Sequence, residues 1–384
     1  MAERRLGIIM NGVTGRMGMN QHLIRSVAAI RSEGGLRLAN GDRLVLDPIL
    51  VGRNEEKLAA LAQAYGIARW TTDLDAALAD PNDELFFDAA TTQMRANLVR
   101  RAIEAGKHVY CEKPTADTLS EAIAIARQAN AAGIKHGVVQ DKLFLPGLQK
   151  LKTCLDSGFF GRVLSVRGEF GYWVFEGDWQ EAQRPSWNYK AAEGGGIILD
   201  MLCHWRYVLD NLFGAVRSVS CLGATHIPER VDEHGHRYTA DCDDAAYATF
   251  QLEGGVIVHI NSSWATRVRR DDLVTFHVDG THGSAVAGLQ KCWTQARVNT
   301  PKPVWNPDIP QKINFFEAWE EVPDNTVFPN GFRAEWELFL RYLVGEVPTF
   351  PWNLEAGAKG VQLAEAGLQS WRERRWIDLP ALEF

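Results

Sequence analysis

Apolar and polar positions follow two different periods along the first part of the chain. Short apolar runs bounded by turn residues are typical of strands, and apolar positions three and four residues apart are typical of helices. The apolar runs lie at residues 6–11, 44–52, 84–91, 107–114 and 134–142. Helical stretches between them end at glycines 66, 106 and 133. Strands that alternate with helices predict an α/β domain with a parallel sheet over residues 1–145.

The pattern changes beyond about residue 150. Twelve of the 13 tryptophans lie there, and residues 162–173, 245–252 and 255–264 alternate between apolar and polar side chains. Such alternation is typical of antiparallel strands with one buried face. Since 384 residues are too many for one ordinary core, we expect a second, α+β domain over residues 146–384, with a large open and mostly antiparallel sheet. The proline-rich residues 300–312 predict a surface connection.

Composition narrows the partners that the chain can have. A net charge of −7 argues against nucleic acid or an anionic membrane as the main partner. The six cysteines contain no C-x-x-C pair, so neither a disulfide framework nor a zinc site is indicated, and we expect no metal. The chain shows no apolar run of signal-peptide or membrane-span length. We therefore expect a cytoplasmic protein.

A glycine-rich turn, NGVTGRMG at residues 11–18, separates the first strand from a helix expected between about Gly15 and Ala29. Glycines there let the backbone approach a pyrophosphate, which binds at the N-terminus of the helix. The spacing is G-x-x-G-x-x-G rather than the commoner G-x-G-x-x-G, and a turn without a ligand is the alternative. The expected dinucleotide contacts in this turn are Gly12, Thr14, Gly15, Arg16, Met17 and Gly18.

The second apolar run ends in VGRN, with Arg53 where an NAD-preferring site usually has a carboxylate. A guanidinium can pair with a 2′-phosphate, so Arg53 favours NADP. The alternative is an arginine that faces solvent, and the choice between NAD and NADP stays open.

The run KHVYCEKP places Lys113 at the carboxyl end of a strand, where ligands of open α/β sheets bind. Pro114 disfavours a helical backbone at Lys113. An ammonium group there can stabilise the oxygen of a substrate. Taken alone, a lysine at a strand end is more often simply solvated.

The stretch GGGIILDMLCHWRYVLD, residues 194–210, carries a carboxylate and an imidazole on one face of a predicted helix. Asp200 and His204 are four residues apart, while another face of the helix is apolar. An imidazole so placed can exchange a proton with a substrate, and we expect the preceding glycines to leave room for a ligand. The alternative is an ion pair on a solvated helix face.

Three segments, NGVTGRMG, AGKHVYCEKP and GGGIILDMLCH, resemble in order and spacing those of the glucose–fructose oxidoreductase / inositol dehydrogenase (Gfo/Idh/MocA) family. The similarity covers nearly the whole chain and includes GFFGRVLSVRGEF and the last helix. The resemblance implies a Rossmann dinucleotide-binding domain before a substrate-binding and oligomerisation domain. It also implies NAD or NADP as the cofactor and a homo-oligomer, a dimer or tetramer.

The resemblance further implies roles for individual residues. His204 exchanges the proton of the reacting hydroxyl, Asp200 orients its ring or binds the substrate, and Lys113 stabilises the substrate oxygen. Further cofactor contacts are expected at Thr91, Glu112 and Lys113. The chain departs from the family at Thr91-Thr92, where Thr-Pro is usual, and at residues 140–142, which read Gln-Asp-Lys. The remaining candidates for substrate contact are Asp141, Lys142, Trp187 and Tyr189.

These features together predict an NAD(P)-dependent oxidoreductase that acts on a secondary hydroxyl, or the matching ketone, of a sugar, glycoside or cyclitol. One alternative is an NAD-dependent glycosidase of the same fold, which returns the hydride within each turnover. Another is a regulator that binds the cofactor without catalysis. The residues 232–244, rich in His, Cys and Asp, fit no standard ligand spacing, so we expect a solvated loop there rather than a metal site.

Overall fold

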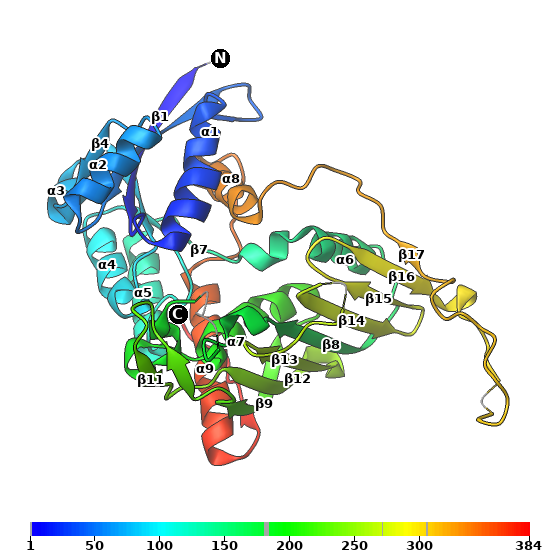
Figure 1. Cartoon of the computed structure of the whole chain (residues 1–384). Coiled ribbons are helices and arrows are strands. Elements are labelled where there is room, and N and C mark those ends of the chain that lie inside the picture. Colours follow the sequence, from blue (N-terminus) through cyan, green and yellow to red (C-terminus); the bar gives the residue numbers. More distant parts are fainter. Residues whose placement is uncertain (1, 180–183, 271, 305) are drawn as a thin grey trace. The chain divides into compact units, whose positions relative to one another are not determined.

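A computed structural model describes residues 2–179, 184–270, 272–304 and 306–384 of the chain. The chain divides into two compact units (Figure 1). The first unit consists of Met1–Phe144, Pro329–Glu365 and Ala381–Phe384, and the second of Leu145–Phe328 and Ala366–Pro380. Among the described residues, no helix is long and apolar enough to cross a membrane.

The first unit is built on a sheet with the strand order β2-β3-β1-β5-β6-β7, and β4 also pairs with β3. The strands are β1 (Glu3–Asn11), β2 (Leu36–Arg37), β3 (Arg43–Val51), β4 (Arg69–Thr71), β5 (Asp83–Asp88), β6 (His108–Cys111) and β7 (His136–Val138). Every pair is parallel except β2–β3. The predicted parallel α/β domain is therefore confirmed. The short strands β2 and β4 were not predicted, because two or three residues show no clear period.

Helices cover both faces of this sheet. They are η1 (Gly18–Ala28), α1 (Ala29–Ser32), α2 (Glu55–Ala64), α3 (Leu74–Ala79), α4 (Thr92–Glu104), α5 (Leu119–Ala132), the 3₁₀ turn η2 (Asp141–Phe144), α8 (Gly331–Leu343) and the start of α9 (Leu354–Glu373). Glycines 66, 106 and 133 have φ of 60°, 71° and 64°, as helix-ending glycines should. The first helix begins where expected, but η1 is a π-helix, a form that often marks a functional site.

Alternate side chains of β1 enter two separate cores, as the pleat of a strand requires. Ile8 and Met10 belong to one core and Ile9 to the other. The first core also takes Trp336 and Phe339 from α8. Sequence analysis assigned all residues after 145 to the second domain. The structure places residues 329–365 and 381–384 in the first unit instead, because the aromatic face of α8 completes its core.

The second unit contains a large mixed sheet with the strand order β17-β16-β15-β14-β8-β13-β12-β9-β18. The strands are β8 (Val163–Gly171), β9 (Val216–Ala224), β12 (Ala245–Leu252), β13 (Ile257–Ser263), β14 (Val274–Gly280), β15 (Gly283–Ala287), β16 (Cys292–Ala296), β17 (Glu320–Glu321) and β18 (Ile377–Asp378). The pair β8–β13 is parallel and the other pairs are antiparallel, as expected. A separate hairpin joins β10 (Glu229–Val231) to β11 (Arg237–Thr239).

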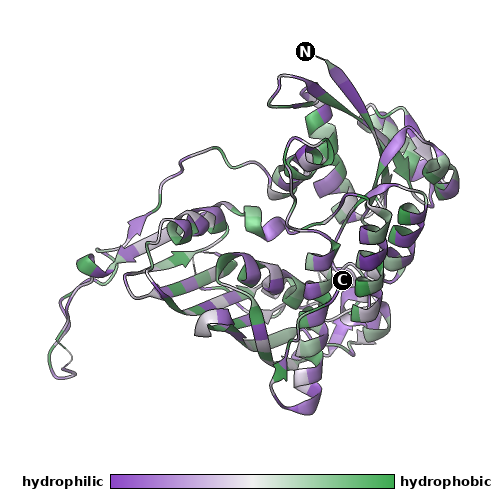
Figure 2. Ribbon diagram, turned by 180° about the vertical axis from the view of Figure 1, so that it is seen from behind, coloured by the Kyte–Doolittle hydropathy of each residue, from purple (hydrophilic) through white to green (hydrophobic). Residues whose placement is uncertain are grey.

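The helices of this unit are α6 (Pro146–Asp156), α7 (Ile197–Leu212) and the end of α9 (Leu354–Glu373), with the 3₁₀ turns η3 (Trp173–Phe175), η4 (Ser186–Tyr189), η5 (Ala191–Glu193), η6 (Glu253–Gly255) and η7 (Arg297–Asn299). Helix α7 packs on β9, β12 and β13. Apolar and polar residues alternate along the strands (Figure 2), and Tyr247 and His259 lie on a side of the sheet that is exposed. The described part of residues 300–312 forms no helix or strand, as expected for a surface connection.

Candidate active site

The carboxyl ends of β1 and β5 lie level in the first unit, since Asn11 pairs with Asp88. The Asn11 side-chain amide donates to Asp88 at 2.8 Å. Gly12 follows with φ of 79°, and a Cβ added there would lie 2.5 Å from the carbonyl carbon of Ala89. Only glycine lets the chain turn this closely past the neighbouring strand end.

The glycine-rich turn has room for a ligand at one of its three glycines. A Cβ added to Gly18 would lie 2.4 Å from the carbonyl oxygen of Gly12, so the turn itself requires glycine there. At Gly15 an added Cβ would have only that same oxygen nearby, at 3.4 Å. The fold therefore does not require glycine at 15, whereas a pyrophosphate that approaches the start of a helix does. The turn fits a dinucleotide.

The other expected cofactor contacts lie around the same edge of the sheet. Thr14 and Arg16 are exposed beside Gly15, and Met17 is half-buried. Arg53 is exposed just beyond the end of β3, and Thr91 is exposed immediately before α4.

A buried arginine, which sequence analysis missed, holds two strand ends together. Arg95 of α4 donates through Nε to Asp88 at 3.1 Å and through its terminal nitrogens to the carbonyl oxygens of Ala90 and Pro114. Burial raises the pKa of Asp88, and the hydrogen bonds from Arg95 and Asn11 oppose that rise. Arg95 thus fixes the segment after Lys113 to the end of β5. No sequence pattern distinguishes it from the other arginines of the same helix.

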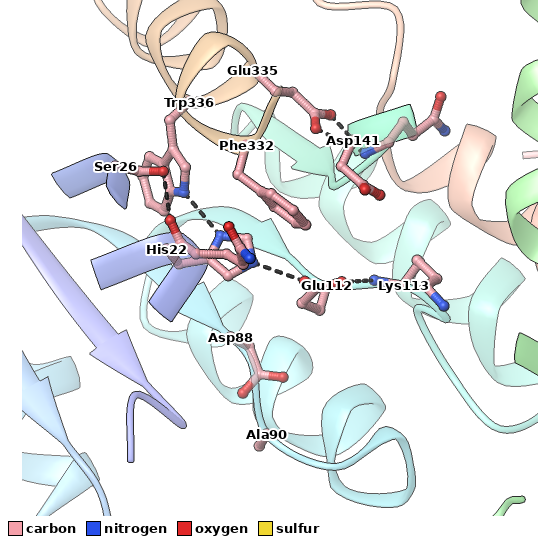
Figure 3. A network of polar contacts seen from close by, with 12 residues as sticks. His22, Ser26, Asp88, Ala90, Glu112, Lys113, Asp141, Phe332, Glu335 and Trp336 are labelled. Atoms are coloured by element: carbon pink, nitrogen blue, oxygen red, sulfur yellow. Dashed lines mark hydrogen bonds and ion pairs between the residues drawn. The ribbon is translucent and has the colours of Figure 1, made fainter. Parts of the chain in front are cut away.

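Glu112 and Lys113 follow the last residue of β6. The two oxygens of the buried Glu112 side chain contact His22 Nε2 at 2.8 Å and the Lys113 backbone N–H at 3.1 Å (Figure 3). Nearby, the buried carboxyl group of Glu335 accepts the backbone N–H of Gln140 at 2.8 Å and 2.9 Å. Burial raises the pKa of Glu335 well above its usual value.

In the second unit, Asp243 anchors the start of α7. Its backbone oxygen accepts the N–H of Ile197 at 3.0 Å, and its side chain accepts the N–H of Ile198 at 2.6 Å. Burial raises the pKa of Asp243 to about 6. A Cβ added to Gly196, whose φ is 116°, would lie 2.9 Å from this carboxylate. Gly196 thus makes room for Asp243 rather than for a ligand, which corrects the expectation for this glycine, whereas an added Cβ at Gly194 would meet no atom within 4 Å.

Asp200 and His204 lie one turn apart on α7, and each has a partner that sequence analysis did not assign. Asp200 forms an ion pair with Arg184 at 3.0 Å. The Arg184 guanidinium also lies over the ring of Trp264, 4.5 Å from its centroid. His204 is buried, and its Nδ1 lies 2.7 Å from the hydroxyl of Tyr207.

Comparisons with known proteins decide the family. The model of the oxidoreductase family with an NAD-binding Rossmann fold matches residues 17–139, and that of the GFO/IDH/MocA C-terminal domain matches residues 148–286. D-xylose dehydrogenase of Paenarthrobacter nicotinovorans is 57% identical over 98% of this chain and 97% of its own length. The chain belongs to the GFO/IDH/MocA oxidoreductase family. It is an oxidoreductase with an NAD-binding Rossmann domain.

More distant relatives agree on the fold of this GFO/IDH/MocA oxidoreductase. Levoglucosan dehydrogenase of Pseudarthrobacter phenanthrenivorans is 27% identical over 63% of this chain and 65% of its own length. A structure of levoglucosan dehydrogenase in complex with NADH and levoglucosan is 21% identical, with a TM-score of 0.80 over 98% of this chain and all of that one.

In this GFO/IDH/MocA oxidoreductase, the other residues expected to contact the substrate differ in their exposure and in their partners. Asp141 and Lys142 lie together in η2, with their charged atoms 3.7 Å apart. Trp187 is 43% exposed, but Tyr189 is fully buried and donates its hydroxyl to the carbonyl of Phe175 at 2.7 Å. The ring and hydroxyl of Tyr189 are engaged within the second unit, which argues against the substrate contact expected from the sequence.

Residues 232–244 form a strand and hydrogen bonds within the second unit. They include β11 and end in Asp243 and Asp244. The Asp244 carboxylate accepts hydrogen bonds from the backbone N–H of His226 and from Arg230, both at 2.8 Å. Over the described residues, no group of three His, Cys, Asp or Glu side chains is arranged to hold a metal ion.

Proposed function

We propose that this chain oxidises a sugar of the D-xylose type with a nicotinamide dinucleotide. The observation that carries the proposal is the 57% identity to a D-xylose dehydrogenase over nearly the whole of both chains. Lys113, Asp200 and His204, which the chemistry requires, are all present in this chain. The bound nicotinamide supplies the acceptor for the hydride that leaves the sugar carbon.

Each of the three residues has a distinct task in this proposal. His204 takes the proton of the reacting hydroxyl as general base. The Arg184 ion pair keeps Asp200 charged and oriented, so that the carboxylate can accept a hydrogen bond from a sugar hydroxyl or steady the charged imidazole. Lys113 stabilises negative charge on the substrate oxygen. Trp187 and the pair Asp141–Lys142 contribute to the choice of sugar.

For the cofactor, the glycine turn with Thr14, Arg16 and Met17 holds the pyrophosphate, and Thr91 and Glu112 line the same edge. The Arg53 guanidinium pairs with the 2′-phosphate of NADP and so extends the cofactor specificity to NADP. Replacing Arg53 with Asp should weaken NADP binding by about 1–3 kcal/mol, the worth of a charge-assisted contact. NAD binding should change little, because a carboxylate there can accept the ribose hydroxyl. Calorimetric titration of both cofactors measures this, and equal small losses would remove the case for NADP.

The exposed side of the sheet in the second unit supports a homo-oligomer. Its cross-strand rows combine exposed aromatic and charged side chains such as Tyr247, His259 and Arg167. A twofold axis would place this same face of two copies against each other. We place the protein in the cytoplasm, where its six cysteines stay reduced.

The test is a panel of pentoses, hexoses, cyclitols and glycosides with NAD and with NADP, following the absorbance of the reduced nicotinamide. D-xylose should give one reduced cofactor per sugar oxidised, and product analysis should identify the carbon attacked. Cleavage of a glycoside without net reduction would indicate the glycosidase alternative. Cofactor binding with no turnover on any sugar would indicate the regulatory one.

A further inference from the structure

His22 lies fully buried in the first unit, in the π-helix η1 that begins after the glycine turn. Three aromatic rings surround it: Phe87 of β5 with ring centroids 4.4 Å apart, Phe332 at 5.1 Å and Trp336 at 6.3 Å. An apolar side chain would fill such a place at a lower desolvation cost. The presence of an imidazole therefore calls for a polar role.

The partners of His22 determine which nitrogen carries its proton. The Trp336 indole N–H donates to His22 Nδ1 at 3.0 Å (Figure 3), and an indole can only donate. Nδ1 must therefore be unprotonated, and the neutral ring carries its hydrogen on Nε2. That hydrogen is donated to Glu112 Oε1 at 2.8 Å.

Glu112 connects His22 to the backbone of Lys113. Its other oxygen, Oε2, accepts the Lys113 backbone N–H at 3.1 Å. Burial would raise the pKa of Glu112, whereas the hydrogen bond from His22 and the positive charges of a protonated His22, Lys113 and Arg95 lower it. The geometry leads to the same state, because both oxygens face a donor, His22 Nε2 and the Lys113 backbone N–H. The side chain is thus a carboxylate, which accepts with both oxygens.

We infer that His22 is a positioning residue for the reaction, which acts by orienting Glu112 and thereby the backbone of Lys113 at the end of β6. The contact chain runs from α8 through the helix of the cofactor turn to this strand end. The inference rests on the proposed role of Lys113 in stabilising the substrate oxygen. A catalytic group displaced by about 1 Å can lose about 100-fold in rate, so a fixed backbone at Lys113 matters.

Two substitutions of similar size separate the two hydrogen bonds. In His22→Gln the side-chain amide reaches the place of Nε2 and can still donate to Glu112. In His22→Asn the amide oxygen reaches the place of Nδ1 and can still accept from Trp336, but the donor to Glu112 is lost. His22→Asn should lower kcat by about 10- to 100-fold, while His22→Gln should stay within about threefold of the wild type. Calorimetric Kd values for NADH should change by less than about threefold in both.

The buried His136 offers a matched control. Its Nδ1 accepts the backbone N–H of Leu354 at 3.1 Å, and its Nε2 contacts the Asn130 amide oxygen at 3.0 Å. Both ring nitrogens of His136 therefore have hydrogen-bond partners, as in His22, but Glu112 is not one of them. His136→Asn and His136→Gln should lower the melting temperature but leave kcat per folded molecule unchanged.

Two further measurements keep the inference testable if a His22 variant fails to fold. Long-range ¹⁵N NMR of the wild type should show His22 as the neutral ring protonated on Nε2. Trp336→Phe should keep that hydrogen, since the Glu112 carboxylate can only accept it, and should change the ¹⁵N shift of Nδ1 alone. Glu112→Gln should also lower kcat, because an amide cannot accept from both His22 and the Lys113 N–H.

The outcomes separate this inference from the proposed function. Equal kcat in folded His22→Asn and His22→Gln would overturn the inference and leave His22 as a packing residue, as would a His22 ring protonated on Nδ1. If Lys113→Ala keeps full turnover, the proposed role of Lys113 fails first. The His22 tautomer would still be measurable in that case.

Discussion

His22 in the first unit and His204 in the second are both buried, with 0% and 6% exposure, and both have a hydrogen-bonded Nδ1. They differ in the partner of that nitrogen. The indole of Trp336 can only donate to His22, whereas the hydroxyl of Tyr207 can donate to His204 or accept from it. A donor-only partner fixes one tautomer, and a hydroxyl allows both. The comparison thus distinguishes a histidine that holds a position from one that can exchange a proton.

The surroundings of the two rings agree with this difference. Aromatic side chains and a carboxylate enclose His22, and both of its ring nitrogens are hydrogen-bonded. His204 lies one turn after Asp200, whose side chain is 23% exposed and paired with an arginine. A carboxylate held one helical turn from the imidazole can stabilise positive charge that develops on it during turnover.

The largest expected effect concerns the proton-exchanging histidine itself. His204→Ala should lower kcat by roughly 10²–10⁴-fold, the usual worth of a positioned acid or base. The Kd of NADH should hardly change, because His204 acts on the substrate. Steady-state kinetics with D-xylose and calorimetry with NADH measure the two effects. Near-normal turnover in this variant would mean that His204, like His22, only holds a position.

The next effect concerns the anchor of the helix that carries His204. Burial raises the pKa of Asp243 from its ordinary 3.8 to about 6. The folded protein therefore binds this proton more tightly than the unfolded chain, so the contribution of Asp243 to stability falls as the pH rises from about 4 to about 6 and stays low above it. Asp243→Asn has no charge to bury. Its stability relative to the wild type should improve by about 1–2 kcal/mol between pH 5 and pH 7.5.

Thermal or urea unfolding of both proteins at the two pH values measures this difference. Asp232 is a suitable control in the same unit, because the backbone N–H of His236 lowers the pKa of its carboxyl. Asp232→Asn should show no change in stability relative to the wild type between pH 5 and pH 7.5, because the Asp232 carboxyl, with its lowered pKa, is ionised in both the folded and the unfolded chain over that range. The same pH trend in both variants would show that Asp243 is charged without penalty at the start of α7.

Sequence periodicity was sufficient for β1, β3, β5, β6 and β7 of the first unit, for the helices between them that end at glycines 66, 106 and 133, and for the edge that holds Gly12, Gly15 and Lys113. These features depend on neighbours in the sequence, on a turn that needs glycine or on a proline after a lysine. The contacts of His22 depend instead on Glu112 and Trp336, which are 90 and 314 residues away. The spacing of apolar residues along the sequence cannot predict contacts between residues so far apart. For the same reason it did not predict that α8 packs in the first unit.

The second unit shows the same limit at shorter range. The spacing of Asp200 and His204 indicated a shared helix face, but the ion pair with Arg184 spans an irregular segment that periodicity cannot interpret. The role of Gly196 was misread for a similar reason. Its φ is 116°, and its neighbour, Asp243, comes from a distant strand connection, so the space beside the glycine is already filled.

The smallest expected effect concerns the partner that distinguishes the two histidines. To take a proton from the substrate at Nε2, His204 must carry its hydrogen on Nδ1 and donate it to the Tyr207 oxygen, 2.7 Å away. When the ring returns the proton from Nε2 in the reverse reaction, Nδ1 keeps its hydrogen and its hydrogen bond to the Tyr207 oxygen. Tyr207→Phe should lower kcat by about two- to tenfold, the net worth of one neutral hydrogen bond. The NADH Kd should stay unchanged.

Trp336→Phe is the counterpart of this change in the first unit, since it also removes one partner of Nδ1 and keeps an aromatic ring. It should change the ¹⁵N shift of His22 Nδ1, which loses its donor, whereas Tyr207→Phe should mainly lower the rate. Parallel kinetics and NMR of the two variants compare them directly. An unchanged kcat in Tyr207→Phe would show that the hydroxyl does not orient His204, and the distinction between the two histidines would then rest on Trp336 alone.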